Sequence, residues 1–236
     1  MRAAGRIVAL TLERLKKEAA PGVKTRDLDL VAAEEMARHG GRSSFLGYRG
    51  YPAHICASLN QEVVHGIPGE RQLEEGDILS LDVGVVYDGY QADGAITVGV
   101  GQVSPLAQRL LEITQGALEA GIAQCRRGKW LGDVSAAIQQ YVEARGFAVV
   151  REYTGHGIGR DLHEEPQIPN FGVPGQGPRL RVGMTLALEP MVTAGGWLTR
   201  VEPNGWTVVT QDGSLAAHFE HTVAIAPEAA EVLTAV

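Results

Sequence analysis

The chain has 236 residues, of which 44% are hydrophobic, and its formal net charge is -7. A chain of this length and apolar content buries a full core, as one large domain or as two small ones. The acidic balance and the lack of any basic run longer than two residues argue against a nucleic-acid surface, which needs concentrated lysine and arginine. The chain has two cysteines and no CxxC pair, which fits a reducing cytosol. One weak disulfide between them is the remaining alternative.

Two amphipathic helices are predicted at the start of the chain. Apolar residues in 3–19 recur at helical spacing, and charged residues interrupt the run well short of a signal peptide or membrane segment. Residues 25–39 repeat this pattern, with Thr25 as the candidate N-cap and Gly40–Gly41 as the stop. Residues 42–64 change to short strands and turns, which indicates that the chain enters a sheet.

A β-hairpin is predicted over residues 77–101, because Asp88–Gly89 is a favoured two-residue turn between two apolar runs. A turn centred there puts Asp93 opposite residue 84, on the strand face that also carries Asp82. The two carboxylates would then be diagonal neighbours, about 7 Å apart at the backbone. A strand edge in water is one alternative for either of them. Since unpaired charges within apolar strands are costly, a shared cation is the simpler explanation.

Two further helices are predicted in the second half of the chain. Ser104 is placed as an N-cap and Pro105 at the first helical position, and residues 133–145 have helical spacing. The remaining predictions are a loop over 166–183, strands over 184–191 and 218–225, and a short helix or frayed end after Pro227.

A weak internal duplication relates the two halves of the chain. The glycines that enclose the second predicted helix recur around the fourth at an offset of 106 residues. At this offset Asp82 falls one position from Glu189. Two halves, roughly 1–103 and 104–236, would therefore supply matching carboxylates within the single domain 1–236.

The stretch from Tyr153 to Pro166, with the sequence YTGHGIGRDLHEEP, surrounds His156 with three glycines and places His163 seven residues later. Glycine-rich backbone marks a close approach to a ligand, a metal or another strand. A glycine-rich turn with a surface histidine is the alternative.

Four carboxylates and one imidazole stand in apolar strands or glycine-rich surroundings, where isolated charges should not persist. An oxygen-rich set with one nitrogen suits divalent cations, and four carboxylates match the charge of two such ions. Each residue alone could equally be capped, exposed or ion-paired. The set is Asp82, Asp93, His156, Glu189 and Glu220.

Ordered motifs along the whole chain give it a family resemblance. It resembles the type I methionine aminopeptidases, which implies an α+β pita-bread fold with a pseudo-twofold antiparallel sheet covered by two pairs of helices. The resemblance also implies that the five residues above are the metal ligands. The motifs are LGYRGYP at 46–52, HGIP at 65–68, LDVG at 81–84, ADG at 92–94, GHGIG at 155–159, LHEEP at 162–166, LEPM at 188–191 and FEHT at 219–222.

The resemblance implies a dinuclear enzyme that removes the initiator methionine from nascent chains with a small second residue. Its two divalent ions would be Co, Mn, Fe or Zn. Glu189 would be general base and proton carrier, His163 would stabilise the oxyanion, and His65 would contact the scissile amide region. A structural hydrogen bond is the alternative role for either histidine. Three other histidines match no motif and are expected at the surface or in packing: His39, His54 and His218.

The resemblance also implies an apolar pocket for the methionine side chain, since thioethers pack well against aromatic rings. Individually, its residues could equally be ordinary core. Three positions depart from the common bacterial pattern, namely Phe45, Arg49 and Leu162, which could reshape the pocket without removing the chemistry. The pocket residues are Phe45, Tyr48, Tyr51, Cys56, Leu162 and Trp206.

Two rival functions are considered. An aminopeptidase P or prolidase would share the fold and all five ligands, but these enzymes usually carry an extra N-terminal domain, for which we expect no room before His65. A non-catalytic binding protein on the same fold is disfavoured because all five ligands are present. We expect a monomeric cytoplasmic enzyme that acts on nascent polypeptide N-termini, without nucleic-acid or membrane partners, and we leave docking to the ribosome open.

Overall fold

A long hairpin lies at the centre of the computed structural model, which describes residues 1–235. It consists of β4 (Ile78–Tyr87) and β5 (Tyr90–Gly99). The turn residues Asp88 and Gly89 have φ angles of 49° and 72°, the left-handed values that a type I′ turn requires. The register pairs Gly84 with Asp93. The predicted hairpin is therefore confirmed, with Asp82 and Asp93 on one face as diagonal neighbours.

The hairpin belongs to a nine-stranded antiparallel sheet with the order β1-β4-β5-β14-β9-β7-β8, in which β2 also pairs with β4 and β15 with β14. The two halves of the chain meet where β5 pairs with β14, with Glu220 opposite Ala95. This seam brings Asp93 and Glu220 onto adjacent strands. The other strands of this sheet are β1 (Arg42–Ser43), β2 (Cys56–Leu59), β7 (Thr154–Gly157), β8 (Glu164–Pro169), β9 (Thr185–Leu188), β14 (Glu220–Ile225) and β15 (Ala230–Val232).

Two smaller sheets of three strands each, in the orders β13-β10-β6 and β11-β12-β3, complete the β-structure of the described residues. A single 3₁₀ turn, η1 (Tyr48–Gly50), interrupts the segment between β1 and β2. The strands are β3 (Glu62–Val64), β6 (Ala148–Val149), β10 (Met191–Thr193), β11 (Thr199–Val201), β12 (Val208–Thr210) and β13 (Ala216–His218).

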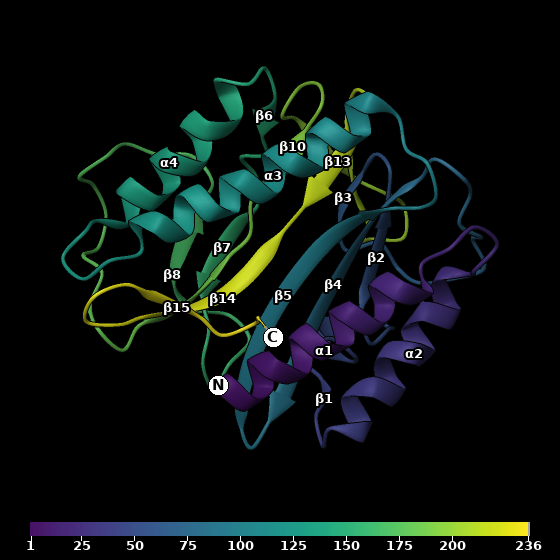
Figure 1. The fold of residues 1–236 in the computed structure, drawn as a ribbon, viewed down its shortest axis with the longest axis horizontal. Helices are drawn as coiled ribbons and strands as arrows, with labels where there is room; N and C mark the ends of the chain where they lie inside the picture. The colour runs from purple at the N-terminus through teal and green to yellow at the C-terminus, as the bar shows by residue number, and fades with distance from the viewer. Residues whose placement is uncertain (236) are drawn as a thin grey trace.

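Two helix pairs cover one face of the large sheet (Figure 1). The first pair, α1 (Arg2–Glu18) and α2 (Thr25–Arg38), buries its apolar side against β4, and the second pair, α3 (Pro105–Gln124) and α4 (Leu131–Glu143), against β9 and β14. The predicted α+β architecture of an antiparallel sheet under two helix pairs is confirmed.

Strand alternation decides which side of the sheet carries polar residues. Leu79, Leu81 and Val83 of β4 belong to the apolar core beneath α1 and α2. Since side chains alternate along a strand, Ser80 and Asp82 point to the opposite side. The helices therefore shield one face, and the polar site lies on the other.

The offset of 106 residues recurs in the structure. Lys24 precedes α2 and Trp130 precedes α4, and each forms an isolated antiparallel bridge, to Gln72 and to Arg179 respectively. The predicted boundary between the halves, at residues 103 and 104, falls in the connection between β5 and α3.

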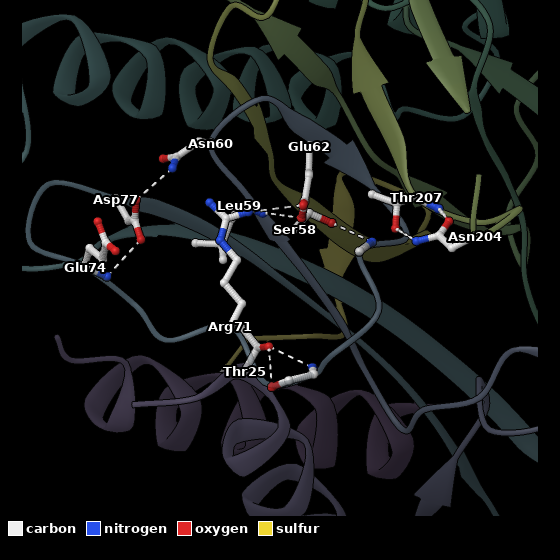
Figure 2. A network of polar contacts seen from close by, with 12 residues as sticks. Thr25, Ser58, Leu59, Asn60, Glu62, Arg71, Glu74, Asp77, Asn204 and Thr207 are labelled. Atoms are coloured by element: carbon white, nitrogen blue, oxygen red, sulfur yellow. Dashed lines mark hydrogen bonds and ion pairs between the residues drawn. The ribbon is translucent and has the colours of Figure 1, made fainter. Parts of the chain in front are cut away.

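Helix starts differ from two of the predictions. Lys24, not Thr25, is the N-cap of α2, and the Thr25 hydroxyl instead exchanges hydrogen bonds with the backbone of Gly69 (Figure 2). The fourth helix begins at Leu131 rather than at 133, because the Asp133 carboxylate accepts a hydrogen bond from the backbone N–H of Trp130 at 2.9 Å. The Asp133 carboxylate, in the first helical turn, therefore caps the helix by accepting from the N–H of the N-cap residue.

Each of the two strands predicted in the last third of the chain is divided into two shorter strands. The segment 184–191 leaves the large sheet after Leu188, where Glu189 is followed by Pro190, which has no N–H for the ladder. The segment 218–225 divides at Phe219 into parts of two sheets. The predicted loop over 166–183 begins with the end of β8. The tail forms β15 rather than a helix or frayed end, because it pairs with β14.

The N-cap of α3 gives a test of local stability. Ser104 Oγ accepts a hydrogen bond from the backbone N–H of Ala107 at 3.2 Å, as the sequence predicted. Replacing Ser104 by Ala should lower the free energy of unfolding by about 1 kcal/mol, measured by urea denaturation, because one N–H at the helix start loses its acceptor. Ser104→Asp, which keeps an acceptor, should remain near wild type. Equal loss in both variants would contradict the capping role.

Candidate active site

A single cavity of about 160 Å³ is lined by every residue that the sequence assigned to a site, together with Arg49. These residues come from segments that are far apart in the chain. The lining residues are Phe45, Tyr48, Arg49, Tyr51, Cys56, His65, Asp82, Asp93, His156, Leu162, His163, Glu189, Trp206 and Glu220.

The floor of the cavity is a cluster of acidic side chains around one imidazole. Asp93, His156 and Glu220 each offer a ligand atom, and these three atoms lie within 4.8 Å of one another. Glu189 Oε1 lies 3.6 Å from His156 Nε2. Asp82 lies on β4 next to Asp93. Four strands of the large sheet and the residue that follows β9 thus bring the whole predicted ligand set to one place.

Hydrogen bonds hold the backbone of Asp93 and the side chain of His156 in position. The Thr222 hydroxyl accepts from the backbone N–H of Asp93 at 2.9 Å and donates to the Asp93 carbonyl at 2.8 Å, which locks β5 to β14 at the cluster. His156 Nδ1 lies 2.8 Å from the carbonyl oxygen of Gly157. Because a carbonyl can only accept, the proton sits on Nδ1 and the Nε2 lone pair faces the carboxylates.

The glycines around His156 permit a close approach of backbones. A Cβ atom at Gly155 would lie 2.4 Å from the carbonyl oxygen of Ala187, and one at Gly157 would lie 2.2 Å from that of Glu165. The glycine-rich stretch from Tyr153 to Pro166 forms strand β7, a turn and the start of β8. The glycines therefore serve the approach of neighbouring strands beside the cluster.

Burial and mutual repulsion dominate the electrostatics of the cluster. Burial, followed by the charge of Asp93, raises the pKa of Asp82, Glu189 and Glu220 well above the usual range. Burial also raises the pKa of Asp93, although nearby His156 opposes the shift. Carboxylates this close repel one another, so the arrangement favours bound positive charge or protons.

The donor set fits divalent cations. Asp82 Oδ1 and Glu220 Oε1 are buried and have no hydrogen-bond partner among residues 1–235. Buried oxygens without a donor are costly unless something else coordinates them. Carboxylate oxygens with one imidazole nitrogen are ligands that Mn²⁺, Fe²⁺, Co²⁺ and Zn²⁺ accept.

Two further histidines face the cavity above the acidic cluster. The Tyr48 hydroxyl lies 2.9 Å from His163 Nδ1, and the two rings stack at 5.4 Å between centroids. Burial, followed by the proximity of His156, lowers the pKa of His163 to about 4, so this ring is neutral near pH 7. Burial also lowers the pKa of His65.

The loop that carries His65 is fixed by polar contacts with its surroundings. His65 itself has a φ of 61°, a left-handed conformation that is unusual for a residue with a side chain. Ser58 Oγ accepts a hydrogen bond from the N–H of Gly66, the next residue, at 3.0 Å (Figure 2). The Thr207 hydroxyl donates to the His65 carbonyl at 3.4 Å. These contacts hold the imidazole over the cavity.

An apolar pocket opens beside the cluster. The Tyr51 ring packs edge to face against Phe45 and Trp206, with the ring centroids 6.5 Å and 5.1 Å apart, respectively. Cys56 and Leu162 are buried in the same apolar group, and burial raises the pKa of the Cys56 thiol well above its usual range. The thiol therefore stays neutral and acts as a small apolar wall of the pocket.

Sequence reasoning missed two residues near the site. Arg49 was noted only as a departure from the family pattern, yet it lines the cavity, with its guanidinium carbon 5.4 Å from the Tyr48 ring centroid. His218, expected at the surface or in packing, is buried, and its Nε2 lies 3.8 Å from Glu220 Oε2. Two-residue spacing on one strand was the signal that could have placed it beside Glu220. His39 and His54 pair with Glu35 and Asp29, away from the cavity.

A metal-dependent hydrolase is the class of protein that this fold and this cluster define, because buried carboxylates that bridge cations are the core of two-metal hydrolases. The comparisons with known proteins agree. Residues 1–227 match the family model described as metallopeptidase family M24.

Curated relatives cover the whole chain. It is 51% identical to methionine aminopeptidase 1 of Bacillus subtilis, over 100% of this chain and 95% of that protein. It is 50% identical to the methionine aminopeptidase of Clostridium perfringens, over 99% and 94% of the two chains. The chain belongs to metallopeptidase family M24.

Solved structures confirm the predicted pita-bread fold. The crystal structure of the methionine aminopeptidase from Thermotoga maritima superposes with a TM-score of 0.99 at 47% identity, over 100% of this chain and 95% of that one. The prolidase from Pyrococcus furiosus has a TM-score of 0.81 at 19% identity, and the chain covers 62% of it. The likeness to prolidase shows the fold alone.

The close contact at Gly157 gives a test of the site. Gly157→Ala should destabilise the protein by about 3 kcal/mol and lower metal uptake, because the added methyl group must displace the backbone of Glu165 next to His156. Gly69→Ala is a matched control, since a Cβ there meets only the Ile67 carbonyl, at 3.9 Å. Thermal unfolding and metal titration of both variants would check this. A Gly157→Ala protein with wild-type stability would contradict the close approach.

Proposed function

We propose that this chain is a type I methionine aminopeptidase, which removes the initiator methionine from nascent polypeptides whose second residue is small. One observation carries the proposal: the apolar pocket of Phe45, Tyr51, Cys56 and Leu162 opens into the same cavity as the buried carboxylate cluster. A cavity with that arrangement holds an unbranched apolar side chain while its amino end and first peptide bond face the cluster. The relatives of about 50% identity, all named methionine aminopeptidases, support the same conclusion.

Two divalent ions would be held by the five predicted ligands, with Co, Mn, Fe and Zn as candidates. When bound, such ions lower the pKa of a water molecule and polarise a carbonyl group. The chain contributes four negative charges to balance them and one neutral nitrogen. The ligands are Asp82, Asp93, His156, Glu189 and Glu220.

The other polar side chains would handle protons and orient the substrate. Glu189 is the candidate to accept a proton from the attacking water and pass it to the leaving amine, since burial gives its carboxyl a raised pKa. His163, with Nδ1 bonded to the Tyr48 hydroxyl, can donate Nε2–H to the oxygen that becomes negative. His65 would hydrogen-bond near the scissile amide.

The partners that fit this activity are the N-termini of nascent polypeptides. The enzyme would act on them in the cytoplasm as a monomer. Among residues 1–235, no helix is both long enough and apolar enough to cross a membrane.

Metal removal should abolish the activity. Purified protein is expected to release methionine from Met-Gly and Met-Ala peptides, to stop after treatment with a chelator, and to recover on addition of cobalt(II) or manganese(II). Saturating metal should also stabilise the fold, by about 2.7 kcal/mol at a hundredfold excess over Kd. Full activity in chelator would refute the metal-dependent mechanism. Cleavage of X-Pro peptides alone would favour the prolidase-type alternative.

The Tyr48 hydroxyl should matter for turnover rather than for binding. Tyr48→Phe keeps the ring that stacks on His163 but removes the hydrogen bond to Nδ1, so the tautomer with Nε2–H loses its preference. We expect kcat to fall about tenfold with a smaller change in KM, as for loss of one hydrogen bond to the reacting system. Tyr87→Phe, on the exposed end of β4, is the control. An unchanged kcat would remove His163 from this role.

A further inference from the structure

We propose that His218 is a positioning residue that holds the carboxylate of Glu220 by donating a hydrogen bond from Nε2, and so raises the affinity of the site for divalent cations. This inference rests on the proposed metal site and assigns a role to a residue outside the ligand set.

Two buried polar groups face each other without a partner. His218 is only 2% exposed, and its Nε2 has no hydrogen-bond partner within residues 1–235. Nε2 lies 3.8 Å from Glu220 Oε2, and Glu220 Oε1 also has no partner among these residues. Leaving a buried donor and a buried acceptor both unsatisfied is costly, so this juxtaposition calls for a physical explanation.

The separation leaves one simple way to satisfy both groups. A distance of 3.8 Å is longer than an N–H···O hydrogen bond, yet shorter than the spacing of two groups that share a bridging water. A movement of about 1 Å would close it to an ordinary hydrogen bond. With the proton on Nε2, the imidazole is the donor and the carboxylate is the acceptor.

The backbones of His218 and Glu220 are both held, so only rotation of the two side chains can close the gap. The Thr97 hydroxyl accepts from the His218 N–H at 2.9 Å and donates to the His218 carbonyl at 2.8 Å. Ser80 Oγ lies 2.8 Å from Thr97 Oγ1. The Thr97 hydroxyl already donates its proton to the His218 carbonyl, so Ser80 is the donor in its hydrogen bond with Thr97. Each group in this series of hydrogen bonds therefore has one consistent role.

The chain break at Phe219 explains how His218 and Glu220 can face each other from different sheets. His218 ends β13 and pairs with Met191, while Glu220 begins β14 and pairs with Ala95 of β5. Glu220 lines the cavity, whereas His218 is not among the described residues that line it. The imidazole therefore supports the carboxylate from behind, where it does not occupy a coordination position.

A donor behind a ligating carboxylate fixes its orientation before the cation arrives. Hydrogen-bond partners of this kind typically change metal affinity by about 10–100-fold when they are removed. The expected consequence is a loss of affinity with no change in the number of ligands.

The test compares two substitutions of nearly the same shape in the full-length metal-free protein. His218→Gln keeps an N–H donor near the Nε2 position, whereas His218→Met has a similar length and no donor. Calorimetric titration with manganese(II), and separately with cobalt(II), should show at least tenfold weaker binding to the Met variant than to the Gln variant at one site or more. His39→Met, at an exposed histidine paired with Glu35, should bind as the wild type does.

The outcomes separate this inference from the proposed function. Equal affinities of the Gln and Met variants, with matching circular dichroism spectra, would overturn the role of His218 and leave the metal site intact. A wild-type protein that takes up neither ion would overturn the metal site and the inference with it. Weaker binding by the Met variant, with melting temperatures of the two metal-free variants alike, would support the proposal, since lost packing alone would affect both.

Discussion

The mutual repulsion of four clustered carboxylates, three of them buried, is the constraint on which this structure depends. Asp82, Asp93, Glu189 and Glu220 converge on one imidazole, and burial raises the pKa of each carboxyl. A sheet that places such groups together is stable only if positive charge or protons neutralise them. The helices on the opposite face supply the apolar burial that keeps the sheet together around this costly centre.

The pairing of β5 with β14 places the repelling carboxylates at the contact between the two halves of the chain. Asp93 comes from the first half and Glu220 from the second, and the Thr222 hydroxyl ties the two strands together beside them. Charge neutralisation at the seam therefore stabilises the contact between halves as well as the site. The same strand break that starts β14 brings His218 behind Glu220.

The apolar pocket and the proposed metal site share one cavity because some of their residues are neighbours in the same ladder. Cys56 of β2, a wall of the apolar pocket, pairs directly with Asp82 of β4, a proposed ligand. His163 likewise contacts both groups: its ring stacks on Tyr48 with the centroids 5.4 Å apart, and the tilted ring of His156 has its centroid 4.2 Å away. A substrate side chain held in the pocket would therefore lie next to the proposed reacting groups, so its binding would also orient the peptide bond.

The sequence by itself determined the features that arise from local chemistry. The Asp88–Gly89 turn set the register of the hairpin and hence the face shared by Asp82 and Asp93, and Ser104 and Pro105 marked the start of α3. The ordered motifs identified the five candidate ligands and the family. These signals are local because turn geometry, capping and side-chain alternation depend on a few neighbouring residues.

Only the tertiary structure decided the features that depend on distant partners. Periodicity could not reveal that β14 would be divided from β13 or that the tail would pair as β15. Likewise, Lys24 rather than Thr25 caps α2, because the Thr25 hydroxyl bonds to Gly69, a residue far along the chain. Such outcomes depend on which strands meet in space, and no local pattern contains that information.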